Sequence, residues 1–337
     1  MAEQEVFGKT SRGETVHRMR ISGGGLTASI LTWGAVIQDL RLEGHKPPLV
    51  LGFENFDDYP RYSPYFGATP GRVANRVTGG RFRLDGKLHQ LELNENGVTH
   101  LHGGSDGIAK RLWDIADLAA DRVVLRITDP DGRAGYPGNC TITATYHLAA
   151  DGVLRVLYES SADQPTPCNI CQHSYFNLDG AETALGHDIM IAADHILEVD
   201  ERQCPTGNLT AVEGTPYDLR VMGPMDRLQN GERLLFDHNF CLSEERAAKR
   251  SVALARSVNS GVSLEVRTTE PGIQFYSGYK LRVPTPGLEG RQYPAFAGFC
   301  LETQGWPDAV NHSGFPGAIL RPGEVLRQET DYVFMKN

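Results

Sequence analysis

The 337-residue chain lacks several features that would place it in common functional classes. It contains no apolar run close to the roughly 20 residues that a membrane-spanning helix needs. Its first residues, Met1 to Gly8, carry acidic rather than basic charge and no apolar segment, so we expect no secretory signal and a cytoplasmic location. Lysine and arginine total 33 against 42 aspartates and glutamates. The net charge of −9 argues against nucleic acid or an anionic membrane as a partner.

Sequence motifs of several well-known chemistries are also missing. The densest glycine run, Ser22 to Gly25, lacks the Lys-Ser/Thr ending of a phosphate-binding loop. No H-E-x-x-H motif occurs. The six cysteines contain one close pair, Cys168 and Cys171, without a second C-x-x-C. In a long chain without an export signal we therefore expect free thiols.

Alternation of apolar and polar residues favours β-structure along most of the chain. Residues Thr141 to Leu148 place Ile, Ala, Tyr and Leu on one face and Thr and His on the other, which is the period of a strand with one buried face. Residues Val262 to Arg267 alternate in the same way. Residues Phe82 to Leu91 contain a central Asp-Gly pair and predict a hairpin.

Helical segments are few, and no shift in composition divides the chain. Short helical turns are expected near Glu54 to Pro60 and from Pro224 to Leu235. Strands and helices do not alternate, which argues against an α/β fold. We find no linker-like segment and no tandem repeat. The sequence therefore predicts an all-β protein in which residues 1–337 form a single large antiparallel β-sandwich with a few short helical turns.

Polar and titratable residues gather in five clusters beside glycine or aromatic residues. The clusters are Gly71–Arg76, His100–Gly104, Gln172–Leu178, Phe236–Phe240 and Leu301–Pro307. They combine histidine, carboxylate, amide and guanidinium groups, which are the groups that bind ligands and transfer protons. These clusters are therefore the candidate site.

The two histidines of the second cluster allow three interpretations. In a strand, residues i and i+2 share a face, so His100 and His102 can point to one site. This spacing occurs in zinc and iron sites. The following pair, Gly103 and Gly104, allows a ligand or backbone to come close. A metal site, a ligand contact and a histidine held in a polar core network are all compatible with the local sequence.

Four other residues have a candidate role beside an ordinary structural one. His173 suits a general acid, but it can equally be a hydrogen-bonded core histidine. Glu302, near Trp306, suits a base with a shifted pKa or a surface glutamate at a strand end. Arg76 offers planar donors for sugar hydroxyls or a carboxylate, or forms a salt bridge. Asp237 belongs to a ligand-binding tip or to a polar turn.

In order and spacing, the five clusters resemble the aldose 1-epimerase (galactose mutarotase) family. The most specific combination consists of Leu101-His102-Gly103-Gly104, His173-Ser174-Tyr175-Phe176-Asn177-Leu178, Asp237-His238-Asn239-Phe240 and Leu301-Glu302-Thr303-Gln304. The similarity extends over nearly the whole chain, from Phe7-Gly8 to Arg321-Pro322-Gly323. It implies a large β-supersandwich. It also implies an isomerase that interconverts the α and β anomers of free aldoses such as D-galactose and D-glucose.

The resemblance further implies roles for individual residues. Glu302 matches the family's catalytic base, His173 its catalytic acid, and His102 a second active-site histidine. The positions that match sugar-binding residues are Asn75, Arg76, His102, His173, Tyr175, Asp237 and Gln274. Either Tyr175 or Trp306 can offer an apolar face to the sugar ring.

Chemistry of this kind sets the expected cofactors and partners. Opening and closing a hemiacetal ring needs only an acid and a base, so we expect no cofactor and no metal, at His100 or elsewhere. The expected partner is a small-molecule sugar. The expected assembly is a monomer or a weak homodimer.

Three other functions stay open. A hexose-6-phosphate epimerase would need basic residues in the site beyond Arg72 and Arg76. A glycoside hydrolase would need two carboxylates across the scissile bond, for which Glu302 and Asp237 are candidates. A non-catalytic sugar-binding homologue would keep Asp237 and the aromatic residues but would need neither Glu302 nor His173.

Overall fold

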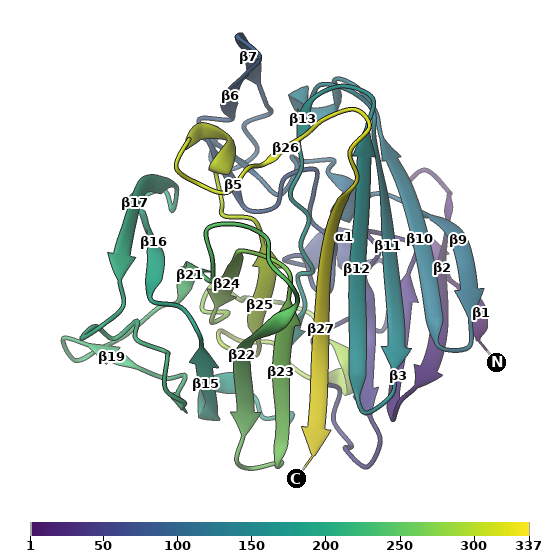
Figure 1. Ribbon diagram of the computed structural model, residues 1–337. Helices are drawn as coiled ribbons and strands as arrows, with labels where there is room; N and C mark the ends of the chain where they lie inside the picture. Colours follow the sequence, from purple (N-terminus) through teal and green to yellow (C-terminus); the bar gives the residue numbers. More distant parts are fainter. Residues whose placement is uncertain (1, 337) are drawn as a thin grey trace.

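A computed structural model describes residues 2–336, and nearly all of the regular structure is antiparallel β-sheet (Figure 1). Within these residues the one α-helix is α1 (Asp58–Tyr62). Short 3-10 turns accompany it, namely η1 (Ile108–Lys110), η2 (Arg133–Gly135), η3 (Ala184–Gly186), η4 (Leu288–Gly290) and η5 (Ala309–Asn311). None of the helices in this part of the chain has the length and apolar character that crossing a membrane requires. The predicted all-β class is confirmed.

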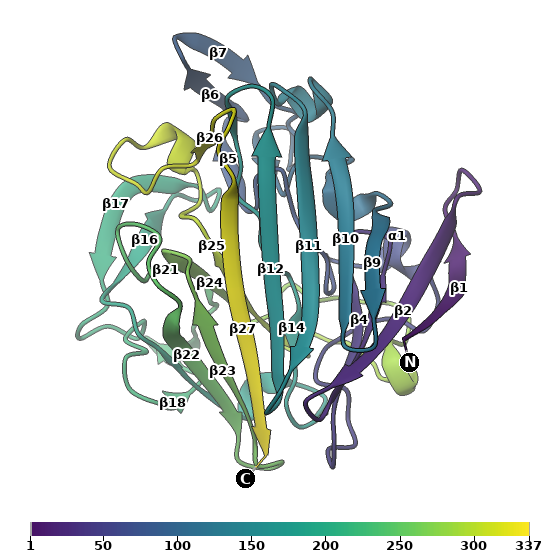
Figure 2. The same cartoon turned by 45° about the vertical axis from the view of Figure 1, so that its right-hand side comes forward.

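The first layer of the fold is a nine-stranded sheet, in which β27 lies beside β12 (Figure 2). From one edge to the other its strands are β18 (Gly223–Pro224), β15 (His187–Ile191), β22 (Arg250–Ser257), β23 (Val262–Thr268), β27 (Leu326–Lys336), β12 (Val153–Ala162), β11 (Cys140–Ala149), β10 (Arg122–Asp129) and β9 (Asp114–Ala119).

The second layer combines a six-stranded and a four-stranded sheet. The six-stranded sheet has the order β14 (Tyr175–Phe176), β25 (Phe299–Gln304), β24 (Gly272–Tyr276), β21 (Asp237–Cys241), β16 (His195–Val199) and β17 (Pro205–Ala211). The four-stranded sheet consists of β1 (Glu3–Lys9), β2 (Thr15–Gly23), β3 (Leu26–Leu31) and β4 (Ile37–Leu42).

Four small two-stranded sheets complete the described structure. They are β5 (Arg76–Thr78) with β8 (Thr99–Leu101), β6 (Arg81–Leu84) with β7 (Lys87–Gln90), β13 (Thr166–Pro167) with β26 (Ile319–Leu320), and β19 (Leu228–Gln229) with β20 (Glu232–Arg233). In both views the β6–β7 hairpin projects from one end of the sandwich (Figures 1 and 2).

The two layers share one apolar core. Buried residues from all three large sheets contribute to it, including Tyr146 and Leu264 from the nine-stranded sheet, Phe275 and Leu301 from the six-stranded sheet, and Ile30 from the four-stranded sheet. Side chains alternate between the faces of a strand. The core position of Phe275 and Leu301 therefore directs their neighbours on β24 and β25 to the opposite face of the six-stranded sheet.

The structure confirms the predicted strands and one of the two predicted helical turns. Residues Thr141 to Leu148 lie within β11, residues Val262 to Arg267 lie within β23, and β6 and β7 form the predicted hairpin. The turn predicted near Glu54 to Pro60 overlaps α1.

The helical turn predicted from Pro224 to Leu235 is wrong. This segment forms the hairpin of β19 and β20. Asn230 and Gly231 connect the two strands with φ values of 53° and 84°. Two successive left-handed residues are the geometry of a tight hairpin turn and cannot continue a right-handed helix.

Candidate active site

Three predicted site residues lie on one face of the six-stranded sheet. Gln274 on β24 is paired with Glu302 on β25 and with Asn239 on β21, and Asp237 lies two residues before Asn239. Because side chains alternate, Asp237, Gln274 and Glu302 share the face that points away from the core. The Nε2 of Gln274 donates to Oδ1 of Asp237 at 2.9 Å, and Nζ of Lys280 lies 3.2 Å from Oδ2.

The two predicted proton-transfer residues face each other across this surface. His173 stands just before β14, where a β-bridge to Ala68 holds its backbone. Its Nε2 lies 3.7 Å from Oε1 of Glu302. The His102 ring lies 5.3 Å from the His173 ring, centroid to centroid. All three residues are buried, so bulk water competes little for their hydrogen bonds.

His102 is held as a neutral hydrogen-bond donor. Its Nδ1 accepts the backbone N–H of Asn75 at 3.1 Å. That contact leaves the ring proton on Nε2. Burial, together with the nearby His173 and Arg76, lowers the pKa of His102 well below its usual value. The ring therefore offers an N–H donor beside the acid–base pair.

The same three residues could in principle hold a metal ion, because their donor atoms lie within 4.8 Å of one another. Metal-bound histidines normally donate their second ring nitrogen to a carbonyl or carboxylate. In His102 the second nitrogen faces the N–H of Asn75, which is a donor. If Nε2 of His102 bound a metal, the ring proton would move to Nδ1. Two donors would then face each other, and the hydrogen bond from the N–H of Asn75 would be lost. The residues present do not fit a metal site well.

His100 does not share a face with His102, contrary to the expectation from their spacing. The Nδ1 of His100 lies 2.7 Å from the carbonyl oxygen of Glu92, and its Nε2 lies 2.7 Å from the hydroxyl of Tyr136. His102 follows the end of β8 with a left-handed φ of 51°, which breaks the strand alternation. His100 is thus a buried histidine satisfied at both nitrogens.

Burial shifts the pKa values of the acid–base pair in opposite directions. Burial and the negative charge of Asp237 raise the pKa of Glu302 to about 8. Burial lowers the pKa of His173 to about 4. Both shifts disfavour the charged form of the buried group. Between pH 4 and pH 8 the two side chains therefore share one titratable proton, which rests on Glu302 while the His173 ring is neutral. Transfer of that proton from Glu302 to His173 produces a carboxylate and an imidazolium.

The predicted Asn75 and Arg76 lie next to the histidines, but Arg76 is already paired. Its Nε and Nη2 each lie 2.8 Å from a carboxylate oxygen of Glu95. The Oδ1 of Asn75 accepts the backbone N–H of Arg76 at 2.8 Å. Arg72 is fully buried and paired with Asp129. Neither arginine is a free cation.

The two aromatic residues proposed to face a sugar are both buried. Tyr175 stacks on His173 with ring centroids 5.2 Å apart, and its hydroxyl donates to the carbonyl of Pro64. The stacked Tyr175 ring therefore packs against one face of the His173 imidazole. Trp306 donates its indole N–H to the carbonyl of Pro271 at 2.9 Å and is 4% exposed. Trp306 is therefore a core residue.

Sequence reasoning missed four residues that touch the site. Tyr65 packs against both histidines, with its ring centroid 4.7 Å from that of His102 and 5.7 Å from that of His173. The others are Lys280, Cys171 and Cys300. Tyr65 stands in the aromatic and glycine-containing segment Tyr65-Phe66-Gly67-Ala68, which was an available signal. The sequence marked Cys171 only as part of a close cysteine pair, and nothing in the local sequence marked Lys280 or Cys300.

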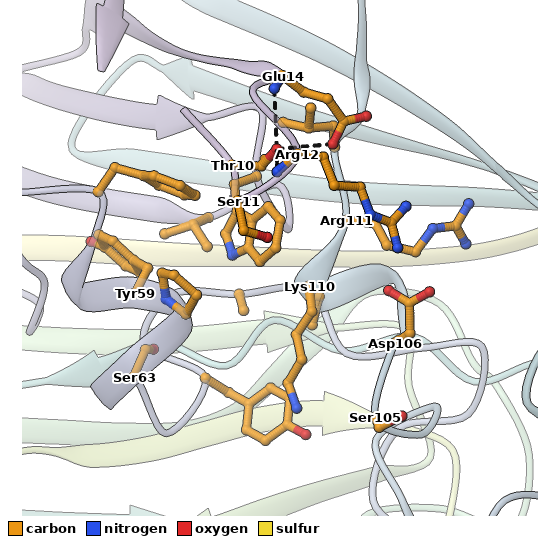
Figure 3. Close-up of a pocket in the computed structure, with 18 of the residues that line it drawn as sticks. Thr10, Ser11, Arg12, Glu14, Tyr59, Ser63, Ser105, Asp106, Lys110 and Arg111 are labelled. Carbon is orange, nitrogen blue, oxygen red and sulfur yellow. Dashed lines mark hydrogen bonds between the residues drawn. The ribbon is translucent and has the colours of Figure 1, made fainter. Parts of the chain in front are cut away.

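A separate pocket lies next to Tyr65 (Figure 3). It has a volume of about 590 Å³ and is lined by residues that include Trp33, Phe56 and Arg111. Figure 3 shows the long side chain of Lys110 reaching across it, with Nζ 5.1 Å from the centroid of the Tyr65 ring. The acid–base pair does not line this pocket. It adjoins the proton-transfer cluster through Tyr65 without being part of it.

Comparisons with known proteins agree on one relationship. The family model described as aldose 1-epimerase matches residues 17–333. The chain is 43% identical over 336 residues to galactose mutarotase of Rattus norvegicus, covering 98% of this chain and 97% of that protein. It is 33% identical to aldose 1-epimerase of Escherichia coli (strain K12), covering 92% of each. The crystal structure of a GalM/aldose epimerase homologue from C. elegans superposes with a TM-score of 0.88 at 30% identity, covering 95% of this chain and 98% of that one.

Proposed function

The chain belongs to the aldose 1-epimerase family and is thus an isomerase of aldose anomers, and we propose that it acts on free D-galactose and D-glucose by acid–base ring opening and reclosure. Glu302 removes the proton from the anomeric hydroxyl O1. Protonated His173 gives a proton to the ring oxygen O5. The C1–O5 bond breaks and leaves an open-chain aldehyde. Rotation about C1–C2 and reclosure, with the two roles reversed, produce the other anomer.

The observation that carries this proposal is the buried contact of 3.7 Å between His173 and Glu302. The pair holds one proton near neutral pH, since the pKa of Glu302 is raised to about 8 and that of His173 is lowered to about 4. Moving that proton from the carboxyl to the imidazole produces the base and the acid together. No net proton has to enter from solvent in a complete cycle.

Neighbouring groups support the sugar and the developing charge. The Nε2–H of His102 is available to donate to an oxygen of the reacting centre. Asp237, held by Gln274 and Lys280, accepts hydrogen bonds from sugar hydroxyls away from C1. Arg76 and Asn75 supply further polar contacts to the sugar, and Tyr175 holds the His173 ring in place by stacking on it.

The structure favours free aldoses over sugar phosphates. The two arginines considered for a phosphate, Arg72 and Arg76, are paired with Asp129 and Glu95. Lys280 is paired with Asp237. A phosphate would have to displace one of these carboxylates, whereas a neutral sugar can share their hydrogen bonds. A sugar-binding protein without activity would have no use for the buried contact between His173 and Glu302.

A bell-shaped pH dependence of kcat/KM is expected, with limits near the two shifted pKa values. Below about pH 4, His173 is protonated while Glu302 also keeps its proton, so no group is left to act as the base. Above about pH 8 the pair loses its only proton, and the acid is lost. Polarimetric rates between pH 3.5 and 9.5, corrected for buffer catalysis, measure both limits. A flat profile across this range would contradict the assignment.

The proposed substrates are tested with anomerically pure sugars. Freshly dissolved α-D-glucose and β-D-galactose are expected to reach rotational equilibrium faster in proportion to the enzyme concentration. Glucose 6-phosphate is expected to show a much smaller acceleration, and an aryl β-galactoside is expected to stay intact. Preferred turnover of the phosphate, or cleavage of the aryl glycoside, would replace the proposed substrate class. Sugar binding in calorimetry without acceleration would leave a binding protein.

The remaining features of the proposal concern the whole protein. We propose that residues 1–337 act as one catalytic domain, as a monomer or weak homodimer, in the cytoplasm. The six free cysteines support a reducing compartment. The proposed reaction moves protons and one C–O bond with no change in oxidation state, so it requires no redox cofactor.

A further inference from the structure

Two buried thiols lie directly behind the acid–base pair. The Sγ of Cys171 lies 3.5 Å from Oε2 of Glu302, and the Sγ of Cys300 lies 3.6 Å from Nδ1 of His173. Both cysteines are fully buried. Each thiol contacts the atom of its partner that does not face the other member of the pair, because Oε1 and Nε2 form the contact between Glu302 and His173.

Each of the two cysteines contacts the reacting residue of the other segment, not the one in its own segment. Cys171 lies two residues before His173, yet its side chain contacts Glu302. Cys300 lies two residues before Glu302 on β25, on the same face of the strand, and contacts His173. Each segment therefore supplies one reacting group and the support for the other. A small shift between the two segments would disturb both contacts.

The thiols are suited to this place because they stay protonated. Burial and the carboxyl of Glu302 raise the pKa of Cys171 well above its usual value, and burial does the same for Cys300. The S–H of Cys171 therefore donates to Oε2. The sulfur of Cys300 accepts from Nδ1–H whenever His173 is protonated. A thiol is a weaker donor than a hydroxyl, so Cys171 supports the carboxylate without overcoming the effect of burial.

We propose that Cys171 and Cys300 are positioning residues that hold the side chains of Glu302 and His173 in their mutual orientation and adjust the two pH limits of the reaction. This inference rests on the acid–base roles proposed above. Other charged or titratable groups also act on the pair. Asp237 and Arg76 face Glu302, while His102 and Asp237 act on His173. These groups stay unchanged in the test.

The test compares the pH dependence of kcat/KM in single cysteine variants. In Cys171→Ala the carboxylate loses a donor, so the alkaline limit is expected to rise by roughly 0.5 pH unit. In Cys300→Ala the imidazolium loses an acceptor, so the acidic limit is expected to fall by a similar amount, roughly 0.5 pH unit. Cys171→Ser keeps a donor and is expected to retain an alkaline limit closer to that of the unmodified enzyme.

Controls separate this inference from a packing effect and from the proposed function. Cys140→Ala removes another buried thiol, one in β11 that contacts neither reacting group, and both limits are expected to stay in place. If Cys171→Ala and Cys300→Ala lower the rate equally at every pH with both limits unmoved, the thiols only fill space and the inference is wrong. If Glu302→Gln keeps full activity, the acid–base proposal itself fails. An inactive Glu302→Gln with unmoved limits in the cysteine variants overturns only the role of the thiols.

Discussion

Replacing Glu302 by Gln is expected to lower the enzyme-catalysed rate of mutarotation by about 10²–10⁴-fold, the usual contribution of a general base. Gln has nearly the size of the protonated carboxyl group, so it preserves the packing around β25. It cannot take the proton from O1 or pass one to His173. The alkaline limit near pH 8 is expected to disappear together with the activity, because the group that titrates there is gone.

The stability of this variant distinguishes a lost base from a damaged fold. The pKa of Glu302 is about 8 in the folded protein and about 4.3 in an unfolded chain. Between these values the folded state binds more protons than the unfolded state, so this group makes stability fall as pH rises. Gln removes that dependence. Glu302→Gln is therefore expected to have a melting temperature at pH 8 equal to or above that of the unmodified enzyme.

A matched substitution gives the control. Glu270 is also fully buried, but it pairs with Arg246 and accepts from Gln328, away from the histidines. Glu270→Gln is expected to lower the melting temperature and to keep the turnover of the folded enzyme. Equal activity loss in Glu302→Gln and Glu270→Gln would argue that any buried carboxylate matters. Full activity in Glu302→Gln would remove the base from the proposed mechanism.

His173→Asn is expected to lower the rate by a comparable factor, about 10²–10⁴-fold, since the acid that serves O5 is lost. Asn keeps a polar group of similar width beside Tyr175 but does not titrate. The acidic limit near pH 4 is expected to vanish. Because Glu302 must lose its proton to act as the base, the residual rate is expected to rise with pH through about 8 instead of falling there. Polarimetry across the pH range measures both effects in one series.

Two histidine variants test the specificity of this result. His187→Asn changes another buried histidine, whose Nε2 accepts the backbone N–H of Leu178, and the catalysed rate is expected to survive. His102→Asn removes a neutral donor rather than the acid, so a reduced rate with both pH limits retained is expected. If His102→Asn loses the acidic limit and His173→Asn keeps it, the two histidines have exchanged roles.

Alternation of apolar and polar residues predicted several of the strands correctly, and the resemblance to a known family supplied the candidate site residues. Alternation marked β11 and β23 correctly, because one buried face repeats every two residues in any strand. The segment from Pro224 to Leu235 forms a hairpin instead of the predicted helical turn, because its Asn230-Gly231 turn outweighs the helical preference of its neighbours. In a short segment one turn determines the secondary structure, because the hydrophobic periodicity of so few residues carries little information.

The chemical state of the site depended on contacts between distant segments. The spacing of His100 and His102 suggested a common face, but the left-handed backbone at His102 and the partners Glu92 and Tyr136 separate them. The ion pair between Arg76 and Glu95 cannot be predicted from the sequence around either residue. Each of these outcomes depends on which segment packs against which.

The candidate groups for the proposed chemistry came from the family resemblance of clusters that lie far apart in the sequence: a carboxylate, two histidines and a set of polar groups expected to bind a sugar. Which of them holds the proton was decided only by the fold. Sheet register brings Glu302 to His173, burial moves their pKa values apart, and the N–H of Asn75 selects the tautomer of His102. Residue types are local properties of a chain, whereas proton affinity depends on the neighbours and the water that the folded protein leaves around a group.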